Sequence, residues 1–208
     1  MQVCTFRTLA REILAAPPRL GPVRMVAVDG PAGSGKTTFA SRLSRAFDAP
    51  VPVVHTDDLL EGWTDLTTFW SRLQCWILDP LRHGAPGKYR RYDWHEDRFS
   101  DGWIKVPLAP AFILEGVTSA RAEVRRELTL GVFVTVPDDL RLARGLERDG
   151  AELREHWRRW MADERRHFAA DRTVEQVRLV VDGAPTIAHD PEREFVTRNP
   201  NEHRGALA

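Results

Sequence analysis

Residues 30–37 combine the residue types that hold phosphate groups. They read GPAGSGKT and fit the pattern G-x-x-x-x-G-K-[ST], known as the P-loop. Bare glycines let successive backbone N–H groups converge on phosphate oxygens, and a helix that follows adds its positive N-terminal end. Lys36 can reach the β- and γ-phosphates of a nucleotide, and the Thr37 hydroxyl can ligate Mg²⁺. We expect nucleotide contacts from Gly30, Ala32, Gly33, Ser34, Gly35, Lys36, Thr37 and Thr38.

The runs on either side favour this interpretation over a glycine-rich turn without a ligand. Residues 23–29 (VRMVAVD) are typical of a β-strand, and Phe39, Leu43 and Phe47 follow the spacing of one helix face. A P-loop requires this order of strand, loop and helix. The sequence therefore predicts a nucleotide site, without distinguishing a kinase from a switch or a motor.

Carboxylates follow two further predicted strands. Asp57 and Asp58 follow residues 51–55 after one threonine, and Glu115 ends the apolar run of residues 111–115. In an open parallel sheet, ligands bind beyond the carboxyl ends of the strands, so these side chains can meet the P-loop. Phosphoryl transfer needs Mg²⁺ and a base for the acceptor hydroxyl. Asp57 and Glu115 are the candidates for these two tasks, whereas Asp58 is as well suited to capping a following helix.

Strands alternate with helices along the chain, which indicates one α/β domain with a parallel sheet of about five strands and helices on both faces. The expected strands are residues 23–29, 51–55, 111–115, 131–136 and 177–183. The expected helices are residues 5–15, 66–83, 138–148 and 151–169, with one more directly after the P-loop.

The handedness of βαβ crossovers predicts the order of these strands. Strand 23–29 should lie between strands 111–115 and 131–136, and strand 51–55 should pair with strand 111–115. Around this sheet the chain divides into an N-terminal helix and linker, the domain itself and an irregular C-terminal tail with three prolines. Their bounds are residues 1–22, 23–183 and 184–208.

Composition limits the class of protein. The chain has 208 residues, 42% of them hydrophobic, and a formal net charge of 0. It can bury a sizeable core, and it has no global basic field that would indicate a nucleic-acid or membrane-surface partner. Cys4 and Cys75 are too few for a disulfide framework, so we expect a reduced, cytoplasmic setting. The start does not resemble a signal peptide, no apolar run approaches the roughly 20 residues of a membrane span, and the oligomeric state stays open.

The ordered motifs resemble one enzyme family. Along residues 23–183 the P-loop is followed by VVHTDDL, YRRYDWHEDR, FILEGV and DLRLARGLERD. This order is similar to that of the uridine kinase-like group of P-loop kinases. The P-loop alone is specific only to a broad superfamily, whereas the ordered set is more specific. The resemblance implies a P-loop kinase-type three-layer sandwich with a short lid, ATP and Mg²⁺ as cofactors, and a small-molecule acceptor with a free hydroxyl.

The roles of the family carry over to the matching positions. The resemblance implies that Asp57 is the base for a sugar hydroxyl and that Glu115, before Gly116, lies near the metal. The lid arginines that clamp phosphates in this family match Arg144 and Arg148. Catalysis is thus assigned to Lys36, Asp57 and Arg148, and the acceptor pocket to Asp57, Tyr92, Asp93, Trp94, Arg98 and Glu115.

Two positions depart from the family. Leu59 and Leu60 stand where uridine kinases usually carry an aromatic pair. Asp97 stands where they use a histidine to read the pyrimidine, and His95 lies two residues closer. A site that hydrogen-bonds one base discriminates strongly because unmet polar groups are costly. We therefore expect uridine to be a poor substrate.

Other interpretations stay open. The chain could phosphorylate a non-nucleoside metabolite or an antibiotic, or bind ATP as a sensor without turnover. A GTPase switch is disfavoured, since no N-K-x-D stretch is present. Residues 84–104, rich in aromatic and charged side chains, suit an acceptor pocket or a surface excursion, and their acidic residues disfavour nucleic acid. Along residues 151–169, an apolar stripe at helical spacing that includes Glu164 predicts a core-facing side.

Overall fold

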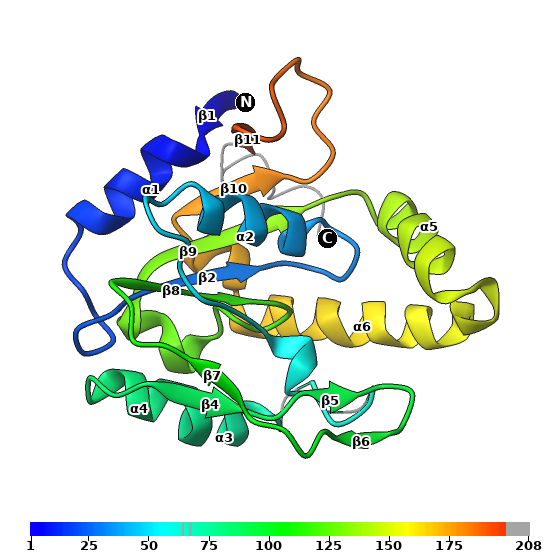
Figure 1. The fold of residues 1–208 in the computed structure, drawn as a ribbon. Helices are drawn as coiled ribbons and strands as arrows, with labels where there is room; N and C mark the ends of the chain where they lie inside the picture. Colours follow the sequence, from blue (N-terminus) through cyan, green and yellow to red (C-terminus); the bar gives the residue numbers. More distant parts are fainter. Residues whose placement is uncertain (64, 67, 199–208) are drawn as a thin grey trace.

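A mixed sheet forms the centre of the molecule. The computed structural model describes residues 1–63, 65–66 and 68–198. In this part of the chain the sheet has seven strands in the order β1-β11-β10-β9-β2-β8-β3, and the neighbours from β10 to β3 run parallel (Figure 1). The strands are β1 Gln2–Thr5, β2 Arg24–Asp29, β3 Val53–His55, β8 Ala111–Glu115, β9 Leu128–Thr135, β10 Leu179–Asp182 and β11 Glu194–Arg198.

Helices connect the strands and cover both faces of the sheet. The α-helices are α1 Phe6–Ala15, α2 Lys36–Arg45, α3 Trp70–Leu73, α4 Asp79–Arg82, α5 Asp138–Asp149, α6 Arg154–Asp171 and α7 Thr173–Gln176. A π-helical segment, Gln74–Leu78, joins α3 to α4, and 3₁₀ turns span Thr56–Asp58, Ala122–Glu127 and Ala151–Leu153.

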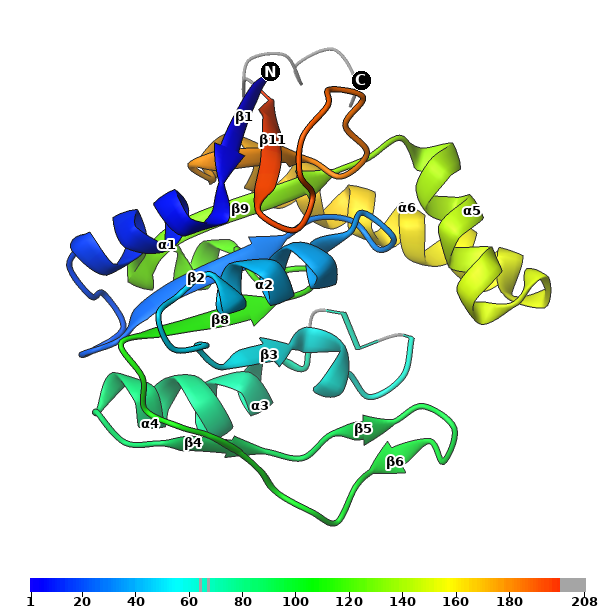
Figure 2. The ribbon, with the colours of Figure 1, turned by 45° about the horizontal axis from the view of Figure 1, so that its top comes forward.

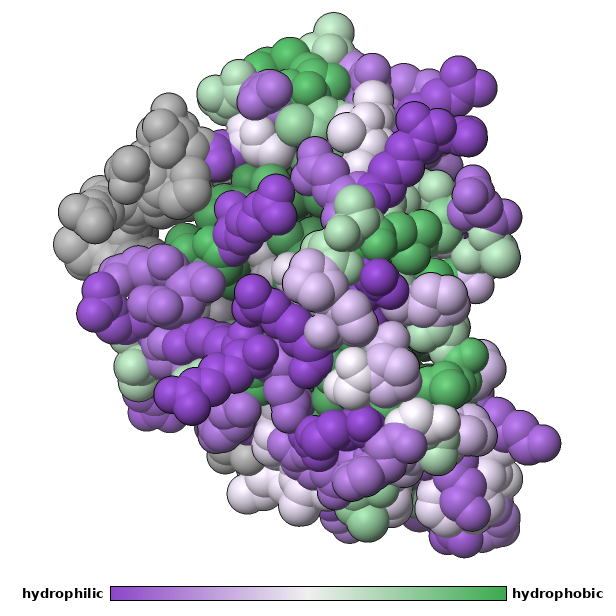
Figure 3. All heavy atoms as spheres, turned by 90° about the vertical axis from the view of Figure 1, so that its left-hand side faces the viewer, coloured by the Kyte–Doolittle hydropathy of each residue, from purple (hydrophilic) through white to green (hydrophobic). Residues whose placement is uncertain are grey.

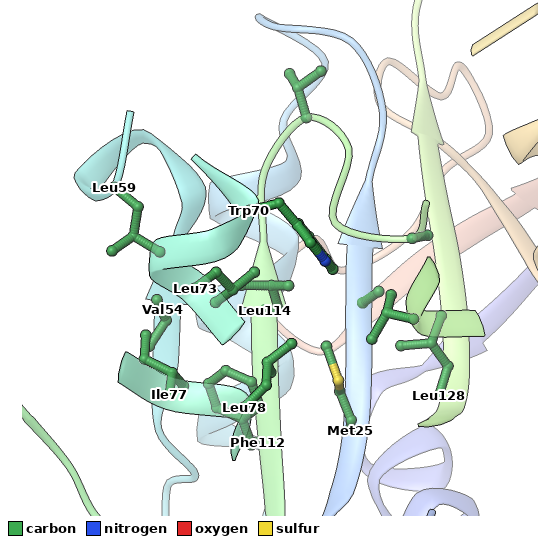
Figure 4. Close-up of a cluster of buried hydrophobic side chains, with 14 of the residues drawn as sticks. Met25, Val54, Leu59, Trp70, Leu73, Ile77, Leu78, Phe112, Leu114 and Leu128 are labelled. Carbon is green, nitrogen blue, oxygen red and sulfur yellow. The ribbon is translucent and has the colours of Figure 1, made fainter. Parts of the chain in front are cut away.

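Side chains that point alternately to the two faces of β2 contribute to two hydrophobic cores. Val26 and Val28 pack with α1 and α2 on one face of the sheet, whereas Met25 and Ala27 face the other side. Because both faces are covered, the strand is apolar throughout, as parallel strands usually are. Figure 2 shows α1 and α2 on one side of the sheet, and Figure 4 shows the α3–α4 helix packing Leu73, Ile77 and Leu78 against β8.

The expected strand order is confirmed. β2 pairs in parallel with β8 on one side and with β9 on the other, and β3 pairs with β8. The three-layer α/β class is confirmed with it, because helices lie on both faces of a sheet whose five central strands are parallel. The carboxyl ends of β2, β3 and β8 therefore meet at one edge, where the P-loop begins.

The sheet extends further than the sequence indicated. The tail from residue 184 was expected to be irregular, yet residues 194–198 form β11, which runs antiparallel to β10. The segment before α1 forms β1, which pairs with β11. Neither strand shows an alternation long enough to be recognised in isolation, because β1 has four residues and an exposed side. Residues 199–208 of the expected tail lie outside the described residues.

Two internal segments also differ in detail. The sequence predicts little regular structure for residues 84–110, but they contain two antiparallel ribbons, β4 Gly87–Tyr89 with β7 Ile104–Val106, and β5 Tyr92–Asp93 with β6 Arg98–Phe99. The helix expected over residues 66–83 runs from Trp70 to Arg82 with the π-helical segment inside it. Gly87 explains the close packing of β4, since a Cβ there would meet the Ile77 backbone at 3.0 Å.

The face at the amino ends of the parallel strands is mainly hydrophilic. It is the left-hand side of Figure 1, and its apolar side chains form small separate patches (Figure 3). Across the described ranges no helix has both the length and the apolar character needed to cross a bilayer. At the opposite end, α5 and the first turns of α6 project beyond the strands as a short lid (Figure 1).

Candidate active site

A large cavity of about 1350 Å³ opens at the carboxyl ends of the strands. The P-loop forms its floor, the 3₁₀ turn after β3 and the end of β8 form one wall, and α5 and α6 form another. Residues 183–191 close a further side. We call the part between the 3₁₀ turn, the β5–β6 ribbon and α6 the acceptor chamber, and the part between the P-loop and residues 183–191 the nucleotide side.

Glycines give the P-loop its path. Gly30, Gly33 and Gly35 have φ angles of 136°, 77° and 96°, which side chains rarely allow. A Cβ on Gly30 would lie 2.2 Å from the Val134 carbonyl oxygen, and one on Gly33 would lie 2.7 Å from that of Arg141. A Cβ on Gly35 would meet open space. The first two glycines thus let the loop pass close to its neighbours, whereas Gly35 is needed for backbone conformation alone.

Some amides of the loop are engaged by the protein itself. The Gly30 amide donates to the Asp29 carboxylate at 2.7 Å, and the Ala32 amide donates to Glu164 at 2.7 Å. The Ser34 amide donates to the Pro31 carbonyl. Three of the eight expected nucleotide contacts therefore cannot come from these N–H groups. No acceptor in the described part of the chain is assigned to the amides of Gly33, Gly35, Lys36, Thr37 and Thr38, which leaves them for phosphate oxygens.

The cations lie over this set of amides. Lys36 is nearly buried and donates to the Pro31 carbonyl at 2.9 Å, which holds its ammonium against the loop. Arg144 lines the cavity and donates to the carbonyls of Gly33 and Gly183. Arg148 lines it too, paired with Asp149 at 2.6 Å. The guanidinium of Arg148 lowers the pKa of the Asp149 carboxyl by hydrogen bonding to it.

Two oxygen ligands suit a Mg²⁺ ion. The Thr37 hydroxyl donates to Glu115 Oε2 at 3.3 Å, and the same oxygen lies 2.5 Å from His55 Nδ1. The hydrogen bond that His55 makes to the Glu115 carboxylate raises the pKa of His55. Within the described residues no group of three or more His, Cys, Asp or Glu side chains is arranged to hold a metal by itself. Mg²⁺ usually takes one or two protein oxygens and completes its shell with phosphates and water, and Thr37 with Glu115 fits that donor set.

Asp57 is the free carboxylate of the cavity. It is exposed to the open cavity, and no hydrogen bond from a described side chain or amide reaches its carboxylate. Protein atoms surround it on the remaining sides, and this loss of hydration raises its pKa, with the charge of Glu115 adding to the effect. Lys36 and Arg148 oppose the rise, so both lie close enough to act on it.

Asp58 has a different role from the helix cap considered for it. Its carboxylate accepts from the Tyr89 hydroxyl at 2.9 Å and pairs with Arg91 at 3.0 Å. The first helix after the 3₁₀ turn begins only at Trp70, too far along the chain for a cap. Asp58 therefore fixes the ribbon strand β4 and its continuation beside Asp57.

The acceptor residues expected from the sequence separate into two groups. Asp57, Trp94 and Glu115 line the cavity. The Tyr92 ring is buried beneath Trp94, and its hydroxyl donates to Asp97 at 2.5 Å. Outside the cavity lining, Asp93 accepts from the amides of His95 and Glu96, and Arg98 is exposed with Asp101 3.9 Å away. The structure therefore places Tyr92 and Asp93 as supports of the ribbon rather than walls of the chamber.

Several residues of the site carry no motif. Glu164 accepts from the Ala32 amide, from Trp160 Nε1 at 2.6 Å and from Arg141 at 2.8 Å, all in the interior. The apolar stripe along residues 151–169 correctly predicted that Glu164 lies on the buried side of α6. The stripe did not indicate that Glu164 connects α6 to the P-loop. Burial raises the pKa of Glu164, while the charge of Arg141 opposes the rise. Trp63 and Trp160 are further walls of the chamber that the sequence did not single out.

Asp29 is the second unrecognised carboxylate. It is fully buried and accepts from the amides of Gly30, Thr118 and Ala120 at 2.7–3.0 Å. Burial raises its pKa to about 7, although the three amides favour the ionised form. Asp29 ends an apolar strand, as Glu115 does. This position at a strand end was the sequence feature that could have identified Asp29 as part of the site. Asp29 joins the start of the P-loop to the loop after β8.

The nucleotide side has a wall that the sequence also left unassigned. Gly183, Ala184, Pro185, His189 and Pro191 line the cavity opposite α2. A Cβ on Gly183 would lie 2.1 Å from the Ser34 carbonyl oxygen, so this segment touches the P-loop. Glu192 pairs with Arg42 of α2 at 2.5 Å and closes the segment over the helix. This wall could hold the part of a nucleotide beyond its phosphates.

Comparison with known proteins agrees with the fold. No protein-family profile and no curated protein sequence matches this chain. A possible uridine kinase from Bacillus stearothermophilus is 20% identical, with a TM-score of 0.62 over 84% of this chain and 96% of that one. A candidate fructose transport system kinase from Silicibacter sp. TM1040 is 21% identical, with a TM-score of 0.57 and the same coverage. The chain thus has the fold of P-loop kinases, and the resemblance to the uridine kinase-like group is confirmed at the level of the fold.

Proposed function

We propose that this protein is an ATP-dependent kinase that transfers a phosphoryl group to a hydroxyl of a small molecule in the cytoplasm. One observation carries the proposal. The free amides of the P-loop, the Lys36 ammonium and the unpartnered Asp57 carboxylate all open onto one cavity. A phosphate-binding loop alone would suit any nucleotide-binding protein, whereas a free carboxylate facing it supports transfer to a second substrate.

The residues divide the work of such a transfer. Asp57 would accept the proton of the acceptor hydroxyl, since its carboxylate opens onto the cavity and no hydrogen bond from the described residues reaches it. Lys36 and Arg148 would stabilise the charge that builds up on the transferring phosphoryl group, and Arg144 would hold the phosphates. Thr37 and Glu115 would hold Mg²⁺, which would supply further charge neutralisation. The lid of α5 and α6 would exclude water from the chamber.

The proposal is tested by measuring ADP release with ATP and Mg²⁺ against a panel of hydroxyl compounds. The panel should contain nucleosides, sugars, amino sugars and pantothenate-like alcohols. We expect release to depend on one class of added acceptor and to be lost in Lys36→Ala. Equal release with and without every acceptor, or tight ATP binding with no release at all, would contradict the kinase assignment and favour a sensor. Efficient turnover of uridine would overturn the expectation that it is a poor substrate.

A further inference from the structure

Aromatic rings wall the acceptor chamber. Trp63, Trp94 and Trp160 line it together with Leu60 and Val117. The Trp63 ring lies 5.6 Å from Trp94 at an interplanar angle of 68°, and 5.7 Å from Trp160 at 82°. Rings that meet near right angles form a corner, and a corner presents a π-face to whatever occupies it. Trp94 keeps 40% of its surface exposed, so part of this corner is open to a ligand.

The polar groups beside these rings are already engaged. Trp94 Nε1 donates to the Asp57 carbonyl at 3.3 Å, and the Tyr92 hydroxyl donates to Asp97. Reading the edge of a pyrimidine needs donors and acceptors that are not engaged elsewhere. The chamber therefore offers ring faces and carboxylates more than it offers hydrogen-bonding edges.

The charge of the chamber is negative. Asp57 and Asp58 both line it. Among the described residues that line this side of the cavity, Arg148 has the one guanidinium, and it is paired with Asp149. His95 is the other basic side chain of this lining. The other basic groups of the lining lie on the nucleotide side: Lys36, Arg42, Arg144 and His189. An anionic acceptor would meet the Asp57 carboxylate here, while Arg148 is paired with Asp149 and Arg91 with Asp58.

We propose that the acceptor is a hydroxyl compound that carries an ammonium group, of the amino alcohol or amino sugar class. The hydroxyl of the acceptor rests on the proposed function, and its positive charge is inferred from the rings and carboxylate of the chamber. A cation is attracted to the face of an indole ring, and most strongly where water is excluded. The Asp57 carboxylate adds to this attraction, whereas Asp58 is paired with Arg91, and the negative phosphates of a bound nucleotide add more. The ammonium sits at the Trp63–Trp94 corner, and the hydroxyl points to Asp57.

A pair of isosteres isolates the charge. Choline and 3,3-dimethylbutan-1-ol have the same shape and the same hydroxyl, but only choline carries a positive nitrogen. Their binding to the full chain, saturated with Mg²⁺ and a non-hydrolysable ATP analogue, can be followed by calorimetry and tryptophan fluorescence. We expect choline to bind about 10-fold or more tightly, the size of effect that a cation–π contact with carboxylates nearby produces. ADP release is measured in parallel with glucosamine, N-acetylglucosamine and glucose, and we expect glucosamine to be preferred.

Variants link the preference to the rings. Trp94→Leu should remove most of the preference for choline, whereas Trp94→Phe, which keeps a ring, should retain part of it. Trp103→Leu is the matched control, because Trp103 is similarly exposed at 42% but stacks on Trp76 and Lys88 away from the cavity. Thermal unfolding of each variant checks that the fold persists.

The outcomes separate this inference from the kinase assignment. Equal binding of the two isosteres, or binding of neither without stimulation of ADP release by glucosamine, overturns the ammonium assignment. Preferred turnover of glucose or a nucleoside overturns it as well, while leaving the kinase assignment intact. A clear preference for choline that disappears in Trp94→Leu supports it even where no acceptor causes ADP release, and that result would contradict the kinase assignment alone.

Discussion

The nucleotide side and the acceptor chamber are built in different ways. The nucleotide side uses backbone amides of consecutive residues, held by positive-φ glycines between β2 and α2. The acceptor chamber uses side chains from separate segments, with Trp63 after the 3₁₀ turn, Trp94 on the ribbon and Trp160 on α6. Backbone geometry suits a phosphate, which is the same in every nucleotide. Side chains on loops can change with the acceptor while the phosphate site stays as it is.

Lys36→Ala should have the largest effect, because it removes the ammonium that is held against the P-loop itself, within reach of the β- and γ-phosphates. We expect turnover to fall on the order of 10³-fold or more, with the fold unchanged by circular dichroism. Lys88→Ala is the control, since Lys88 stacks over Trp103 on the surface ribbon. Turnover in Lys36→Ala similar to that of the control would refute the assignment of the phosphate site.

Asp57→Asn tests the point where the two sides meet. The amide is nearly isosteric but cannot accept a proton, so we expect a loss of turnover of roughly 10²–10⁴-fold with ATP affinity little changed. Asp58→Asn should cost less turnover and more stability, because Asp58 holds Tyr89 and Arg91. If the two variants exchange these behaviours, the base is Asp58.

The same contrast explains what the sequence could predict. The P-loop is a run of adjacent residues whose types follow from one local task, so the motif gave the loop, its strand and its helix. The order of β3, β8, β2 and β9 followed as well, because crossover handedness leaves few arrangements. Asp57 and Glu115 were found because they end strands. Their positions in the cavity agree with the roles assigned to them, which stay predictions.

The arrangement of the residues that line the acceptor chamber could not be predicted from the sequence in this way. Trp63, Trp94 and Trp160 lie far apart in the sequence, and only the folded chain brings their rings together. Tyr92 and Asp93 belong to the right segment, but the turn of the ribbon directs them to Asp97 and to backbone amides. β11 was missed for a related reason, since a short edge strand is defined by the partner that it pairs with.

Glu164→Gln tests whether the two sides depend on each other. Glu164 binds the Ala32 amide on the nucleotide side and Trp160 in the chamber, and it neutralises buried Arg141. The change leaves buried Arg141 with the exposed Asp138 as its remaining carboxylate partner in the described chain, which should lower the free energy of unfolding by about 2 kcal/mol. We expect nucleotide affinity to fall by up to about 10-fold as well, since a neutral amide oxygen anchors the Ala32 amide more weakly than a carboxylate does.

The control for this change lies on the same helix. Glu155 is exposed and pairs with Arg158, so Glu155→Gln should alter the free energy of unfolding by less than about 1 kcal/mol. Urea unfolding gives the stability of both variants, and calorimetry with an ATP analogue gives the affinity. Similar results for the two variants would show that α6 merely covers the P-loop.

The smallest expected effect is a shift in pH dependence. The Asp57 carboxyl must be ionised to accept a proton, and its pKa is raised by its loss of hydration in the cavity and by Glu115. As the pH falls through this raised pKa, the carboxyl becomes protonated and kcat/KM declines. The acid limb of the profile should therefore lie above the usual carboxyl value of 3.8. Arg148 opposes the rise, so Arg148→Gln should raise the pKa of Asp57 further and move the limb to higher pH.

Arg148→Gln also lowers the maximal rate if the side chain holds phosphates, so the position of the limb is compared after each profile is normalised to its own plateau. Arg158→Gln serves as control, because Arg158 is exposed and pairs with Glu155 on the outer side of α6. A limb that moves in Arg148→Gln and not in the control supports Asp57 as the titrating base. A limb at the same pH in all three proteins would mean that a group beyond the reach of Arg148 controls the rate, and the division of roles between Asp57 and the lid would have to be redrawn.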